Sequence, residues 1–141
     1  MGSPLRILCL SNMYPGSDAP DYGAFIQTMC DALEARGNDV ARVVIDSRSR
    51  GLVQTPAKYL GLARRAAPAA ARADVIYAHY LFPTGAIARL AGRRAGIPWV
   101  ITAHGGDVRN LRSPSIAALS APALTGAASL IAVSRYLADQ L

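Results

Sequence analysis

Five short apolar runs alternate with longer amphipathic segments along the 141-residue chain. Each run is nearly continuous in apolar residues rather than alternating with polar ones, which is typical of strands covered on both faces. The predicted strands are 5–10, 40–45, 75–78, 99–103 and 130–133. These runs therefore predict a parallel sheet packed between layers of helices.

The segments between the runs have the length and spacing of helices. The first, 22–36, stops at Gly37, a residue that suits the end of a helix. Its apolar stripe at helical spacing consists of Phe25, Ile26, Met29, Cys30 and Leu33. Further helices are expected over 54–72, 84–94 and 115–125, and after the N-cap residue Ser134.

Two prolines and three apolar residues predict where these helices are interrupted and which face of the third is buried. Pro68 is expected to end or kink the second helix and Pro122 to interrupt the fourth, because proline lacks a backbone N–H. In the third helix, Ile87, Leu90 and Ala91 are expected to face inward.

Strands and helices alternate about every 24–35 residues, the pattern of repeated βαβ units. We expect one domain over 1–141, an α/β fold with an open, mostly parallel Rossmann-like sheet and helices on both faces. In the usual strand order the first and fourth strands are neighbours, and ligands bind beyond their carboxyl ends. The polar loops 11–23 and 104–110 should therefore face each other across a crevice.

Composition narrows the class of protein. Hydrophobic residues make up 52% and charged residues 17%, which excludes intrinsic disorder. The net charge of +6 permits contact with nucleic acid or an anionic membrane, but the basic residues are scattered and we expect no nucleic-acid partner. No apolar run approaches a membrane span and no signal-peptide layout precedes the first strand, so a cytoplasmic location is expected.

Several motifs are missing from the sequence. Only Gly16 and Gly23 punctuate the first loop, so a nicotinamide-binding G-x-G-x-x-G is absent, although Asp46 could mimic its ribose-binding acid. There is no G-K-[ST], no D-x-D and no G-x-S-x-G. His79 and His104 have no metal-ligand spacing, so no metal is expected. Because the dinucleotide motif is also missing, no organic cofactor is expected.

The best candidate residue is His104, which follows the fourth predicted strand. Gly105 and Gly106 would clear space for a ligand beside it, and Asp107 would either contact that ligand or cap the next turn. His79 ends the third strand, where it would line the same crevice or pack in the core.

The first loop offers a second candidate. Gly23 opens the first helix, where it would either expose N–H groups to an anion or serve the turn alone.

Together these segments resemble the amino-terminal half of family-four glycosyltransferases. The resemblance covers nearly the whole chain in the family's order. The matching segments are Tyr14-Pro15, 22–26, 33–37, His79-Tyr80 with 83–85, 96–107 and 132–134.

This resemblance implies a retaining hexosyltransferase of GT-B architecture that uses a nucleotide-sugar donor and a sugar or lipid-linked acceptor. In that family the amino-terminal domain mainly holds the acceptor, and the carboxyl-terminal domain grips the donor with a glutamate pair eight positions apart. Glu34 is the only glutamate here. We therefore expect a fragment that lacks the donor-binding domain and is inactive alone.

The resemblance also implies roles for individual residues. His104 falls on the family's histidine near the transferred sugar and is the predicted catalytic residue. Gly106 stands where relatives often have serine. The predicted substrate-binding residues are Gly16, Tyr22, Gly23, His79, Tyr80, Gly105, Gly106, Asp107 and Ser134.

Two alternatives remain at this point. The chain could be a Rossmann-like ligand-binding module without catalysis. In addition, Lys58, Arg65 and Arg72 recur every seven residues on the second predicted helix, with Arg64 beside them. This basic face would either hold the domain against the anionic inner face of a membrane or be solvated.

Overall fold

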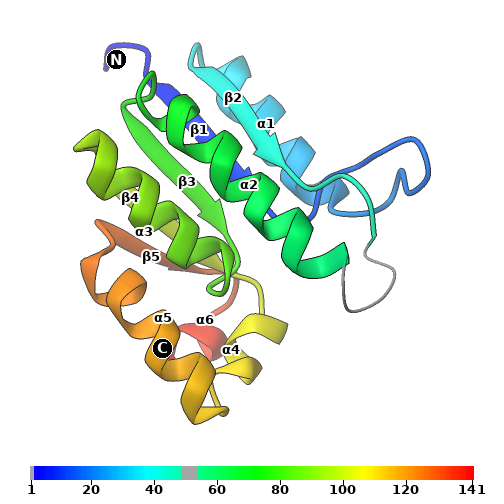
Figure 1. Ribbon diagram of the computed structural model, residues 1–141. Helices are drawn as coiled ribbons and strands as arrows, with labels where there is room; N and C mark the ends of the chain where they lie inside the picture. Colours follow the sequence, from blue (N-terminus) through cyan, green and yellow to red (C-terminus); the bar gives the residue numbers. More distant parts are fainter. Residues whose placement is uncertain (1, 49–53) are drawn as a thin grey trace.

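The computed structural model describes residues 2–48 and 54–141 and contains a five-stranded, all-parallel sheet (Figure 1). The strand order is β2-β1-β3-β4-β5. The strands are β1 (Arg6–Ser11), β2 (Asp39–Val44), β3 (Val75–His79), β4 (Trp99–Ala103) and β5 (Ser129–Ala132). Each lies within one or two residues of its predicted position, so the predicted Rossmann-like α/β fold is confirmed.

Five of the six described helices connect the strands as crossovers, and α6 follows β5. The helices are α1 (Ala24–Ala35), α2 (Gln54–Ala70), α3 (Thr84–Ala95), α4 (Gly106–Asn110), α5 (Pro114–Gly126) and α6 (Arg135–Ala138). Figure 1 shows α2 and α3 side by side in front of the sheet, with α4 and α6 near the carboxyl end of β4. The short α4 lies within 104–110, which the sequence analysis treated as a loop.

The sheet carries a hydrophobic core on each face. Alternate residues of β1 point to opposite faces, as in any strand. Leu8 and Leu10 pack in the larger core, which is shared with α2, α3 and α5, while Ile7 and Cys9 pack with residues of α1. Apolar residues are therefore needed along β1, which explains its continuous apolar run. The same expectation is wrong for β5, the last strand of the order, where Leu130 and Ile131 are 39% and 41% exposed.

The predicted neighbourhood of the first and fourth strands is wrong. β1 pairs with β2 on one side and β3 on the other, while β4 pairs with β3 and β5. The chain reverses its direction of travel across the sheet between β1 and β3, which is the switch point of the other common doubly wound order. The end of β3 therefore lies between the two polar loops.

Pro122 lies inside the continuous helix α5, so the predicted interruption did not occur, and Pro68 does not end α2, which continues to Ala70. Proline leaves the carbonyl four residues earlier without its helical partner. Pro68 and Pro122 are exposed, as are Arg64 and Ala118 four residues before them. Water can therefore solvate the freed carbonyls, which lowers the cost of continuing the helix.

Two apolar residues assigned to the core lie at the surface. Leu90 is 65% exposed and Phe25 is 46% exposed. On α3 the buried face consists of small residues instead, because the helix packs closely against Trp99: a side chain at Gly92 would lie 2.9 Å from the Trp99 ring. The helix is thereby rotated away from the orientation that Leu90 would favour.

Candidate functional site

His104 lies directly after β4, and three aromatic rings from α1 and the end of β3 lie close to it. The ring centroid of Tyr80, after β3, is 4.6 Å away, and that of Phe25, from α1, is 5.1 Å away. His79, at the end of β3, places its Nδ1 3.2 Å from His104 Nε2. The structure thus brings the predicted residues His79, Tyr80 and His104 together at the carboxyl edge of the sheet.

His79 is 0% exposed, so it acts on the site only through its hydrogen bond to His104. Burial, aided by the nearby His104, lowers the pKa of His79 to about 3. Its Nε2 is buried without a hydrogen-bond partner among the described residues. Because a buried N–H without an acceptor costs more than an unused lone pair, the favourable arrangement has His79 Nδ1–H donating to His104 Nε2.

This arrangement fixes the proton of His104 on its other ring nitrogen, Nδ1. Partial burial lowers the pKa of His104, and Asp107 opposes that effect. At neutral pH the ring is therefore uncharged. Its Nε2 accepts the hydrogen bond from His79, and its Nδ1–H is a donor outside that bond. Such a group can hydrogen-bond a hydroxyl or a developing anion, but it is a poor proton acceptor.

Tyr80 is held in an unusual backbone conformation beside His104. Its φ of 77° is left-handed, which costs a non-glycine residue about 1–3 kcal/mol. Its N–H donates to the Thr102 carbonyl and its hydroxyl to Met13 Sδ at 2.9 Å. Burial, aided by Asp107, raises the pKa of Tyr80 to about 12, so the hydroxyl stays protonated. Tyr80 therefore links the first loop to the end of the sheet.

Asp107 anchors the turns that follow β3 and β4. Its Oδ1 accepts hydrogen bonds from the backbone N–H groups of His104, Gly105 and Val108 at 2.8–3.0 Å. Its Oδ2 accepts one from the N–H of Leu81 at 3.0 Å. The residue is only 6% exposed. The carboxylate therefore holds the backbone on either side of the site, and direct substrate contact by Asp107 stays a prediction.

The two glycines after His104 differ in what they require. Gly105 has φ 123°, which disfavours any other residue, and a Cβ there would contact Leu137 Cδ1 at 3.8 Å. At Gly106 a Cβ would have no described atom within 4 Å. The backbone beside His104 is thus open on this side, as the sequence analysis expected.

The glycines of the first loop are needed for packing. Gly23 has φ 72°, and a Cβ there would lie 2.8 Å from the Met13 carbonyl carbon. A Cβ at Gly16 would collide with the backbone carbonyl oxygen of Asp46. These contacts press the loop against β2 and against itself, and binding of phosphate or acceptor by these residues remains a prediction.

Tyr22 and Ser134 also make local contacts. The Tyr22 hydroxyl donates to the Asn12 carbonyl oxygen at 3.2 Å, and Arg48 lies over its ring. Ser134 accepts a hydrogen bond from the Leu137 N–H, so it is the predicted N-cap of α6. Their predicted contacts with substrate are not tested by this geometry.

The sequence analysis missed two residues of the site. Phe25 was assigned to the core stripe of its helix, and Met13 was given no role. Both belong to segments that meet β3 and β4 only after the sheet has formed. The contact between Phe25 and His104 could be predicted only by knowing which segments are neighbours in the fold. Neither phenylalanine nor methionine carries a local sequence signal for such a position.

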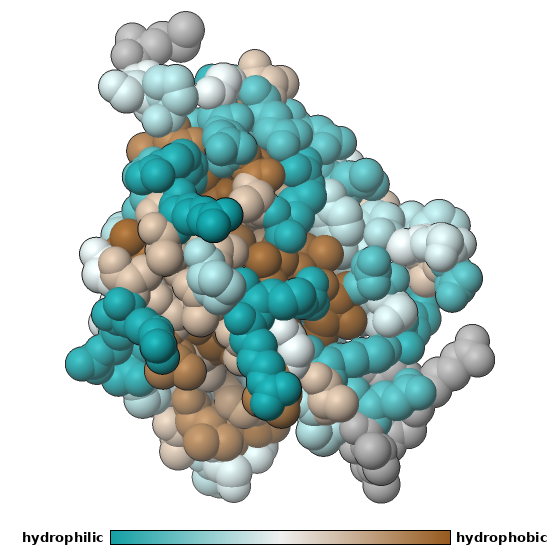
Figure 2. All heavy atoms as spheres, turned by 45° about the horizontal axis from the view of Figure 1, so that its top comes forward, coloured by the Kyte–Doolittle hydropathy of each residue, from teal (hydrophilic) through white to brown (hydrophobic). Residues whose placement is uncertain are grey.

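Part of the predicted basic face contacts the protein's own backbone. Lys58 Nζ donates to the carbonyls of Ser47 and Arg48, and Arg65 Nη2 donates to that of Val44. Arg72 lies beyond the end of α2. Figure 2 shows hydrophilic side chains in separate groups with hydrophobic surface between them. Membrane contact stays a prediction; within 2–48 and 54–141 no helix has the length and apolar character of a membrane span.

Comparison with known proteins identifies the family of the chain. Two of the similar proteins are glycosyltransferases by name. An uncharacterized glycosyltransferase of Methanocaldococcus jannaschii, MJ1178, is 36% identical over 70 residues, covering 48% of this chain and 20% of that protein. The putative teichuronic acid biosynthesis glycosyltransferase TuaC of Bacillus subtilis is 26% identical, covering 96% of this chain and 46% of that protein.

The chain thus spans less than half the length of either relative. The family described as "Glycosyl transferase 4-like domain" matches residues 1–141, the whole length of the sequence. This match confirms the resemblance found in the sequence. The chain therefore belongs to the glycosyl transferase 4-like domain family.

Proposed function

We propose that this chain is the acceptor-side domain of a retaining glycosyltransferase that moves a hexose from a nucleotide sugar to an acceptor hydroxyl. Membership in the family and the names of the two relatives support glycosyl transfer. The observation that carries the assignment of a site is His104, whose ring is held by His79 and whose backbone N–H is held by Asp107, beside an open glycine backbone.

In this proposal His104 orients the transferred sugar or stabilises charge on it through Nδ1–H. Its lowered pKa keeps the ring neutral, so it is not assigned the role of a general base. Preorganisation is the physical advantage, because His79 and Asp107 already hold the ring and its backbone before any ligand arrives. No metal or organic cofactor is part of the proposal.

The remainder of the reaction requires groups that this chain does not supply. The family's donor-binding glutamate pair has no counterpart in a sequence whose only glutamate is Glu34. We therefore expect residues 1–141 alone to transfer no sugar. Turnover of any nucleotide sugar by this domain in isolation would contradict that expectation.

The test uses the complete protein that contains this domain, a panel of nucleotide sugars, and detection of the released nucleotide. His104→Ala should lower turnover by about 10²-fold, because it removes a preorganised donor without removing the anchor at Asp107. The matched control is Leu90→Ala, at a residue that is exposed on α3 and lines neither the site nor its neighbourhood. Unchanged turnover in a folded His104→Ala protein would remove His104 from the reaction.

A further inference from the structure

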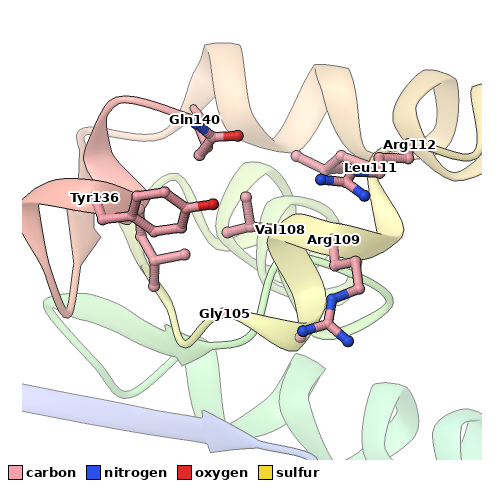
Figure 3. A pocket seen from close by; sticks show the side chains of 9 residues that line it. Gly105, Val108, Arg109, Leu111, Arg112, Tyr136 and Gln140 are labelled. Carbon is pink, nitrogen blue, oxygen red and sulfur yellow. The ribbon is translucent and has the colours of Figure 1, made fainter.

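A pocket of about 390 Å³ opens beside the two glycines that follow His104. It lies between α4 and α6, and Figure 3 shows side chains of both helices around it. The lining residues are Gly105, Gly106, Val108, Arg109, Leu111, Arg112, Tyr136, Leu137 and Gln140. Because Gly105 directly follows His104, the pocket adjoins the proposed reaction site.

The rim of this pocket is cationic. Arg109 lies on α4 and Arg112 in the turn that follows it, and both line the pocket. The pocket lining, all within the described chain, contains no carboxylate. The ion pairs between described residues involve other arginines, and Asp107 is turned inward to four backbone N–H groups. Two guanidinium groups therefore face this space without a counter-charge from the described chain.

The base of the pocket is apolar. Val108 is buried, and Leu111 and Leu137 are half-buried against the larger core. The Tyr136 hydroxyl and the Gln140 amide add neutral hydrogen-bonding groups at the rim (Figure 3). An apolar base below a cationic rim fits a molecule with a weakly polar body and one anionic group. A neutral sugar would leave both guanidinium charges uncompensated.

We propose that this pocket binds an anionic group of the acceptor, a phosphate or a carboxylate, through Arg109 and Arg112. Guanidinium groups bind both anions with charge-assisted hydrogen bonds, often bidentate. The assignment to the acceptor rests on the proposed function, since the anion would lie next to His104. The pocket specifies an acidic acceptor rather than a neutral one.

The experiment measures local hydrogen–deuterium exchange in the complete protein, in peptides that cover 105–112 and 135–140. The probes are inorganic phosphate, D-glucuronate and neutral D-glucose. Phosphate or glucuronate should slow exchange in both peptides, and glucose should not. Protection by phosphate alone indicates a phosphate-bearing acceptor, and protection by glucuronate indicates a uronic acid. The local readout separates this pocket from anion binding elsewhere in the protein.

Two double variants make the test specific. Arg109→Gln with Arg112→Gln should weaken probe binding at least about tenfold, which corresponds to about 1.4 kcal/mol. The control is Arg93→Gln with Arg94→Gln, which removes the same charge from exposed residues at the end of α3. No protection by either anion, or equal loss in both double variants, would overturn the proposal.

The outcome can be separated from that of the proposed function. If the complete protein transfers no sugar but anions protect both peptides, the proposed function fails and the anion pocket stands. If transfer proceeds and the Arg109→Gln, Arg112→Gln protein keeps its KM for every acceptor, the pocket has no part in acceptor binding and the proposal fails.

Discussion

The two polar loops at the carboxyl edge of the sheet have similar composition but use their polar groups differently. In the loop between β1 and α1, side chains bond to neighbouring elements: Asn12 donates to the Tyr59 hydroxyl of α2, and the Tyr14 hydroxyl accepts from Arg42 of β2. In the turn after β4, the single carboxylate of Asp107 satisfies the backbone. These polar groups of the first loop are therefore used in contacts within the fold. In the second loop, His104 still has a ring N–H that can bind a ligand.

This difference shows what loop polarity can and cannot indicate. Both segments are polar because their backbones leave the sheet, and such groups must be hydrogen-bonded or solvated. A polar side chain in such a loop is a candidate for ligand binding only when other groups already hydrogen-bond the backbone around it. His104 meets that condition because Asp107 and His79 have taken over the backbone and one ring nitrogen.

Removing the anchor of the second loop should have the largest effect on stability. Asp107→Ala leaves four backbone N–H groups without their acceptor, and we expect the free energy of unfolding to fall by about 3 kcal/mol or more. Urea unfolding followed by circular dichroism measures this change. Asp139→Ala, at an exposed residue, should change stability by less than about 0.5 kcal/mol. Equal losses would mean that the Asp107 contacts are weak.

Tight packing of the first loop can be tested with two glycines. Gly23→Ala forces a side chain into a left-handed residue and against Met13, and we expect a loss of about 2–3 kcal/mol. Gly37→Ala is the matched control, since it has φ 90° but no described atom within 4 Å of its added Cβ. It should cost only about 1 kcal/mol in the same unfolding measurement. A Gly23→Ala loss no larger than that of Gly37→Ala would show that the contact with Met13 yields easily.

The histidine pair should make the stability of the domain depend on pH. The pKa of His79 is lowered to about 3 in the folded state, against 6.5 when unfolded. Below 6.5 the unfolded chain therefore binds a proton that the folded one rejects, and stability falls as pH falls. Between about pH 6.5 and about pH 5 the loss should reach about 2 kcal/mol.

Unfolding curves across this pH range in wild type and His79→Phe would isolate that contribution. The variant should show a flatter dependence, because its ring cannot take up the proton. If both proteins lose stability in parallel, His79 is not the group that titrates.

A single hydroxyl in the first loop should have the smallest effect. Tyr22→Phe removes one hydrogen bond to the Asn12 carbonyl, and we expect a loss of about 1 kcal/mol or less by urea unfolding. Tyr136→Phe, on a side chain that is well exposed, should have no measurable effect on unfolding. A larger loss for Tyr22→Phe would mean that the loop depends on one bond rather than on a network.

The sequence by itself determined the elements of this protein and the end of the sheet that carries its site. The continuous apolar runs matched burial on both faces in β1, although not in β5, and Gly105 suited the left-handed turn after His104. The cap at Ser134 was also evident, because capping involves residues three apart. All of these features depend on neighbours along the chain, which the sequence displays directly.

Only the tertiary structure decided the strand order, and the composition of the site followed from it. With β3 beside β1, His79 and Tyr80 lie between the two polar loops, and Phe25 meets His104 from α1. Asp107 became an anchor because the N–H of Leu81, 26 residues earlier, came within its reach. Such contacts join groups far apart in sequence, and strand pairing, which no local pattern of polarity encodes, selects which of them meet.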